Sequence, residues 1–115
     1  MLPEPQYRNV VLDLHLYTVW SGFTTLQQYY DEASRWAEEI RSLVPFYPVI
    51  VGEMSLATGL DNYSVEQRQT FASKEMASFR DNALGYVFWS YKLAFASADW
   101  SFLDAAPYIK DYYKV

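Results

Sequence analysis

A single carboxylate closes the most β-branched apolar run of this chain. The segment Val49-Ile50-Val51-Gly52 is followed at once by Glu53, and continuous Val/Ile runs are typical of strands buried on both faces. In parallel α/β folds the chemistry takes place at the carboxyl ends of such strands. Glu53 is therefore a candidate catalytic or binding group. The structural alternative is a strand-end carboxylate that pairs with a cation or caps a helix.

A second group of polar side chains follows a Val/Leu run near the N-terminus. The two-residue period of a strand places Asp13, His15 and Tyr17 on one face. We expect His15 and Tyr17 to face a site at the end of that strand. Asp13 points the same way, and its expected role is structural, in an ion pair with Lys92 or Arg8.

Other catalytic classes find little support in the residues. His15 is the only histidine and there is no cysteine, so we expect neither a metal site nor thiolate chemistry, and no cofactor. A serine hydrolase is a poor fit because the chain has no Gly-x-Ser-x-Gly turn.

The candidate residues need strands to hold them, and the chain alternates strand and helix patterns. Strands are predicted over residues 9–17, within 47–55 and over 86–93, and helices over 26–43, 64–80 and about 103–113. This βα-βα-βα order predicts a parallel sheet joined by crossover helices. Because no linker or low-complexity segment divides the chain, residues 1–115 are expected to form one domain.

The helix starts have clear local signals. Thr25 with Gln28, and Ser64 with Gln67, have the spacing of capping boxes. The first helix has apolar residues at the 3.6-residue period, which predicts one broad buried face. Pro45 follows its end and leads into the strand that carries Glu53.

Composition limits the class of protein. A chain of 115 residues with 51% apolar side chains can bury one core. Its net charge of -5, without a basic block, argues against nucleic acid as a partner. No apolar run reaches the roughly 18 residues needed to span a bilayer. Met1–Pro5 lacks the features of a signal peptide, so the residues alone leave the compartment open.

Aromatic residues are unusually frequent. Eleven Tyr, seven Phe and four Trp are more than a core of this size places easily. Either they pack in the core and at an unpaired interface, or some of them form a surface that stacks on sugar rings. Trp20, just after the first predicted strand, is a candidate for lining the same cleft as His15 and Tyr17.

Four short motifs then suggest a family. They are Val11–Tyr17 (VLDLHLY), Val51–Ser55 (VGEMS), Phe88–Lys92 (FWSYK) and Trp100–Phe102 (WSF). In this order they resemble the C-terminal part of glycoside hydrolase family 5, especially its exo-β-1,3-glucanase-like branch. The match covers nearly the whole chain and aligns it with the sixth to eighth strands of a (β/α)8 barrel. The resemblance implies three βα units of a partial TIM barrel and, for the family, secretion.

The resemblance also implies roles for individual residues. Glu53 matches the nucleophile of a retaining glycosidase that acts on a β-glucan or β-glucoside. His15 and Tyr17 match the pair that borders the cleavage subsite, and Trp89 matches the aromatic platform under the sugar ring. A tyrosine hydroxyl can hold the carboxylate in position, and a tryptophan face can stack on the C–H face of a pyranose.

Part of the family's pattern is missing. Retaining hydrolysis needs a second carboxylate about 5 Å from the first, and in this family it lies in an Asn-Glu-Pro motif ahead of everything in this chain. Pro3-Glu4-Pro5 lacks the Asn, so Glu4 receives no role. The branch also commonly has a Glu where this chain has Ala94.

Two hypotheses follow. The chain is a β-glucanase or β-glucosidase that obtains its acid from a partner chain or a further segment, or it is an incomplete barrel fragment that self-associates and binds sugars weakly. In both cases the unpaired strand edges predict a homo-oligomer, formed by edge pairing or by element swapping.

Overall fold

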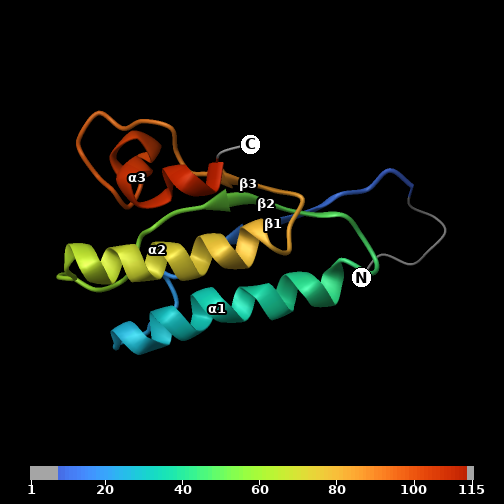
Figure 1. Ribbon diagram of the computed structural model, residues 1–115, viewed down its shortest axis with the longest axis horizontal. Coiled ribbons are helices and arrows are strands. Elements are labelled where there is room, and N and C mark those ends of the chain that lie inside the picture. The colour runs from blue at the N-terminus through green and yellow to red at the C-terminus, as the bar shows by residue number, and fades with distance from the viewer. Residues whose placement is uncertain (1–7, 114–115) are drawn as a thin grey trace.

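The computed structural model of the chain describes residues 8–113 and has a small α/β architecture (Figure 1). Three strands alternate with three helices, and a short 3-10 helix follows. The elements are β1 (Leu12–Leu16), α1 (Leu26–Leu43), β2 (Val49–Met54), α2 (Val65–Arg80), β3 (Gly85–Phe88), α3 (Phe102–Ile109) and η1 (Lys110–Tyr113). Glu4 and the segment considered above for a signal peptide lie outside the described residues.

The strands form one parallel sheet in the order β1-β2-β3, as the alternation of patterns predicted. The helices α1 and α2 lie side by side along one face of this sheet (Figure 1). In β1, Leu14 and Leu16 pack toward the helices, whereas Asp13 and His15 are exposed on the other side. Within residues 8–113 no helix covers that other side, which we call the open face.

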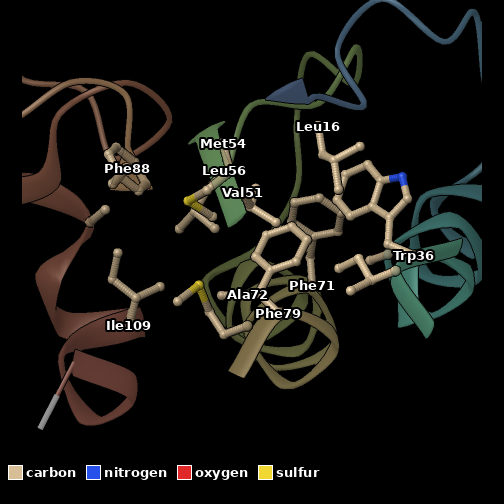
Figure 2. Packing of buried hydrophobic residues seen from close by; sticks show 14 of the residues in the cluster. Leu16, Trp36, Val51, Met54, Leu56, Phe71, Ala72, Phe79, Phe88 and Ile109 are labelled. Atoms are coloured by element: carbon tan, nitrogen blue, oxygen red, sulfur yellow. The ribbon is translucent and has the colours of Figure 1, made fainter. Parts of the chain in front are cut away.

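The core fills the space between the sheet and the helices. Figure 2 shows α2 at its centre, with Trp36 of α1 on one side and Ile109 of α3 on the other. The rings of Trp36 and Phe79 stack with their centroids 5.5 Å apart. The buried Ser78 hydroxyl donates to the carbonyl of Ala33 at 2.6 Å and so joins α2 to α1.

Both predicted capping boxes are present. The side chains of Thr25 and Ser64 accept hydrogen bonds from the backbone N–H groups of Gln28 and Gln67. Each glutamine side chain in turn accepts from the backbone of its N-cap residue. Because these bonds satisfy donors that a helix start leaves free, they fix where α1 and α2 begin.

Three predicted elements had wrong boundaries. The first strand was expected over 9–17, but β1 covers only Leu12–Leu16. The third strand was expected over 86–93, but β3 ends at Phe88, because β2 ends at Met54 and offers no partner beyond it. The Trp89–Ser90 peptide is cis, and Ser90 bonds instead to the backbone of Trp100 and Phe102. The last helix was expected to continue to about residue 113, but it changes to the 3-10 helix η1 at Lys110.

One core side chain contradicts the apolar pattern around it. Glu75 of α2 is fully buried, and neither oxygen of its carboxyl group has a hydrogen-bond partner among residues 8–113. The hydroxyl of Tyr113 is also buried, and it has no partner within this described part of the chain. Because burial disfavours the charged form, the pKa of Glu75 lies well above its ordinary value of 4.5.

Two further absences apply to the described part of the chain. None of its helices has the length and apolar character needed to cross a bilayer. No three His, Asp or Glu side chains among residues 8–113 are grouped so that they could hold a metal ion.

Candidate active site

A β-bulge places Glu53 on the open face of the sheet. Leu14 of β1 pairs with Val51 of β2, but the next residue, His15, pairs with Glu53. Gly52 is therefore an extra residue in β2, which is the definition of a bulge. In a regular strand Glu53 would share the helix-facing side with Val51. The extra residue turns Glu53 to the open face and turns Met54 into the core, where Met54 is fully buried.

Tyr17 holds one oxygen of the Glu53 carboxylate. Its hydroxyl donates to Glu53 Oε2 at 2.8 Å. Burial and this hydrogen bond raise the pKa of Tyr17 well above its ordinary value, so the hydroxyl keeps its proton and remains a donor at neutral pH. Thr18, the next residue, is buried and donates to the carbonyl of Ala57 at 2.9 Å. This bond ties the loop after β1 to the loop after β2 and keeps Tyr17 beside Glu53.

His15 lies between two carboxylates. Its Nδ1 is 3.5 Å from Glu53 Oε2 and its Nε2 is 3.2 Å from Asp13 Oδ2. His15 and Tyr17 thus approach the same oxygen of Glu53. Among residues 8–113, no donor contacts the other oxygen, Oε1, so this oxygen is free to react. The sequence placed Glu53, His15 and Tyr17 at the carboxyl ends of two predicted strands, and the structure brings these three side chains together.

Asp13 does not have the partner that the sequence suggested. The expected ion pair with Lys92 or Arg8 is wrong. One oxygen of Asp13 faces His15, and the other, Oδ1, accepts from the backbone N–H of Gly52 at 2.8 Å. The bulge explains this choice, because an extra residue in a strand leaves its N–H without a ladder partner and Asp13 supplies the acceptor.

Three aromatic rings form a wall beside the Tyr17–Glu53 pair. The ring centroids of Tyr17 and Trp20 are 5.2 Å apart, and Trp100 lies 5.8 Å from Tyr17 and 6.0 Å from Trp20. Trp20 is 73% exposed, so much of its indole faces solvent next to the site. The sequence pointed to Trp20 but not to Trp100, although Trp100 begins one of the four motifs quoted above.

Trp89 directly follows β3, beside the end of β2. Its backbone N–H donates to the carbonyl of Met54 at 2.8 Å, so its backbone adjoins the end of the strand that carries Glu53. Its side chain is 54% exposed and takes no part in the ring contacts of Tyr17, Trp20 and Trp100. The platform role predicted for Trp89 therefore stays a prediction.

A hollow lies at the start of α2. Tyr63, Arg68 and Asp99 are among its lining residues. Arg68 pairs with Asp99 and lies over the Tyr63 ring, 4.4 Å from its centroid. Because its charge is already neutralised, this arginine is not free to bind an anion, and we assign the hollow no role.

The bulge leads to a first testable prediction. A Cβ atom on Gly52 would overlap the Asp13 carboxylate, so Gly52→Ala should drive Asp13 away from both of its partners. We expect the free energy of unfolding to fall by about 1–3 kcal/mol, measured by urea denaturation. Gly85→Ala is the matched control, since a Cβ atom there meets nothing within 4 Å. Equal losses in the two variants would contradict the role of the Gly52–Asp13 contact.

Comparisons with protein-family models, with curated proteins and with solved structures found no match to this chain. Function is therefore inferred from the chemistry of the residues around Glu53 and from the resemblance of the four motifs.

Proposed function

We propose that this protein is a glycoside hydrolase of the retaining β-glucanase or β-glucosidase type, with Glu53 as its nucleophile. One observation carries the proposal. Glu53 lies at the carboxyl edge of a parallel sheet, with Tyr17 bonded to one oxygen and no donor on the other among residues 8–113. A retaining glycosidase needs such a carboxylate, held in place and free to attack.

The proposed step is a nucleophilic displacement at the anomeric carbon. Oε1 of Glu53 attacks the anomeric carbon of a β-glucoside, a bond forms between them, and the bond from that carbon to the leaving oxygen breaks. The leaving oxygen takes the electron pair, and a covalent glycosyl-enzyme remains. The Tyr17 hydroxyl on Oε2 orients the carboxylate during this step.

The tryptophans support a sugar as the substrate. Pyranose rings have an apolar C–H face that gains from contact with a flat aromatic surface. Trp20 and Trp100 lie next to Tyr17, and Trp89 is exposed at the end of the neighbouring strand. We therefore infer that a β-linked glucoside lies against Trp89 and Trp20 with its anomeric carbon at Glu53.

A retaining glycosidase also needs an acid/base group, and a second carboxylate must supply it. Asp13 is the carboxylate linked to Glu53 through His15, but both of its oxygens are already engaged, by Gly52 and His15. This observation favours the second candidate function, a catalytically incomplete barrel fragment that self-associates and binds sugars weakly.

An activated substrate separates the two candidates. The leaving group of dinitrophenyl β-glucoside is a stable phenolate that departs without protonation. Glu53 alone can therefore form the glycosyl-enzyme. We expect phenolate release and a covalently bound glucosyl group on Glu53, found by mass spectrometry of peptides. Added azide should speed turnover and give the β-glucosyl azide, because it attacks the intermediate without a general base. A folded protein with no label and no phenolate release would support the second candidate function, a catalytically incomplete fragment.

The incomplete sheet motivates a proposal about assembly. Within the described residues, β1 and β3 each pair on one side only, and Val11 and Val87 are about half exposed. Unpaired strand edges are templates for association. We propose that copies of this chain join at these edges and so extend the partial barrel.

The assembly predicts a mass above that of one chain. Light scattering during size exclusion should give a multiple of 13.5 kDa, and Val87→Lys should shift the protein toward the monomer, because a charge at the edge opposes pairing. Val65→Lys is the matched control, since Val65 is exposed at the start of α2. A stable monomer in the wild-type protein would overturn the proposal.

A further inference from the structure

Asp13 contacts both features that orient Glu53, which are the bulge at Gly52 and the His15 ring. Its Oδ1 accepts from the N–H of Gly52, the extra residue of the bulge that turns Glu53 to the open face. Its Oδ2 lies 3.2 Å from Nε2 of His15, whose other ring nitrogen faces Glu53. One carboxylate therefore contacts both the backbone before Glu53 and the ring beside it.

The contact with Gly52 fixes which oxygen faces which partner. Gly52 leaves no room for a Cβ atom because Asp13 occupies that space, and its N–H requires an acceptor. With Oδ1 committed to this N–H, only Oδ2 is left for His15. Asp13 and Glu53 can both only accept hydrogen bonds, and a neutral ring has one proton to donate. The Nε2–Asp13 contact at 3.2 Å is a hydrogen bond, whereas the Nδ1–Glu53 contact is longer, at 3.5 Å, so the geometry favours the proton on Nε2.

We propose that Asp13 is a positioning residue that holds the neutral His15 ring in the tautomer with its proton on Nε2. In this tautomer the Nδ1 lone pair faces Glu53 Oε2 and donates nothing to it. The nucleophile then accepts one hydrogen bond, from Tyr17, and keeps more of its negative charge for attack. The tautomer can be tested by itself, whereas the consequence for attack rests on the function proposed above.

The substitution Asp13→Asn tests the tautomer directly. The amide oxygen must face the Gly52 N–H, so the amide nitrogen must face Nε2 of His15. Since that nitrogen donates, Nε2 has to accept, and the proton has to move to Nδ1. The variant should therefore invert the tautomer while it keeps the bond that satisfies the bulge.

Because His15 is the only histidine, its ring nitrogens can be observed without overlap. Nitrogen-15 NMR of the full chain, at a pH where the ring is neutral, should place the proton on Nε2 in the wild-type protein and on Nδ1 in Asp13→Asn. Glu38→Gln, an exposed helix position, removes the same charge and should leave the ring unchanged. A wild-type ring with its proton on Nδ1, or one unchanged in Asp13→Asn, would overturn the proposal.

Kinetics form the second arm. If the wild-type protein releases phenolate from dinitrophenyl β-glucoside, Asp13→Asn should slow the release roughly 10- to 100-fold, the usual scale for partners that orient a functional histidine. An inverted tautomer with an unchanged rate would overturn the catalytic part of the proposal. If the wild-type protein releases no phenolate, the proposed function fails, and the tautomer result still decides whether Asp13 orients His15.

Discussion

Glu53→Gln should abolish covalent labelling by dinitrophenyl β-glucoside and reduce phenolate release by on the order of 10⁴-fold or more. The amide has nearly the same shape and still accepts the Tyr17 hydrogen bond, so the site should keep its geometry. It lacks the negative charge that forms the bond to the anomeric carbon. The measurement is phenolate absorbance over time, together with the intact mass of the protein.

Two controls make this result specific to Glu53. Glu38→Gln removes one carboxylate from the exposed side of α1 and should label and turn over like the wild-type protein. Circular dichroism should give the same spectrum for both variants, because neither residue belongs to the core. Phenolate release that survives Glu53→Gln at the wild-type rate would exclude Glu53 as the nucleophile.

Glu75→Met should raise the free energy of unfolding at neutral pH by about 1–3 kcal/mol, the cost of burying a polar group without a compensating hydrogen bond. Both carboxyl oxygens of Glu75 are buried and have no partner in the part of the chain that the structure describes, so the folded state loses their hydration and gains no hydrogen bond there in return. Methionine fills a similar volume without polar atoms. Urea denaturation at one fixed protein concentration measures the difference.

The pH dependence has a definite sign. The pKa of Glu75 is raised in the folded state above its ordinary value of 4.5. Its protonated form is therefore favoured by folding, and the stability that this proton provides is complete below about pH 4.5. That stability is lost as the pH rises through the folded-state pKa. We expect Glu75→Met to remove this decline above pH 4.5, and Glu38→Gln to preserve it.

A loss of stability in Glu75→Met at neutral pH, with the decline unchanged, would contradict this account. Glu75→Gln adds a further comparison. The amide cannot ionise, so the pH-dependent part should also vanish, but its polar atoms remain buried and the gain should be smaller than with Met.

The sequence determined the elements that depend on near neighbours. Thr25 with Gln28 and Ser64 with Gln67 place the starts of α1 and α2, because each capping box closes within four residues. The two-residue period placed His15 in β1 and Tyr17 just after it on the side of Glu53, because the extra residue lies in β2 and not in β1. The alternation of strands and helices predicted the parallel sheet, because a crossover helix returns the chain so that the next strand runs in the same direction.

The strand ends and the partners of Asp13 depended on contacts between distant segments. β3 is shorter than its aromatic run because β2 ends at Met54. Asp13 pairs with His15 and Gly52 because the bulge leaves a backbone N–H free beside it. Trp100 joins Trp20 and Tyr17 across 80 residues of chain or more, and no local pattern records such a contact.

The position and orientation of Glu53 depended on both the sequence and the tertiary structure. The sequence by itself placed a carboxylate at the end of the Val49-Ile50-Val51-Gly52 run. Counted by twos, however, that run would have turned the carboxylate toward the helices. Only the tertiary structure decided that it faces the open side, because the extra residue at Gly52 is accommodated when β2 pairs with β1 and the side chain of Asp13 accepts the spare N–H.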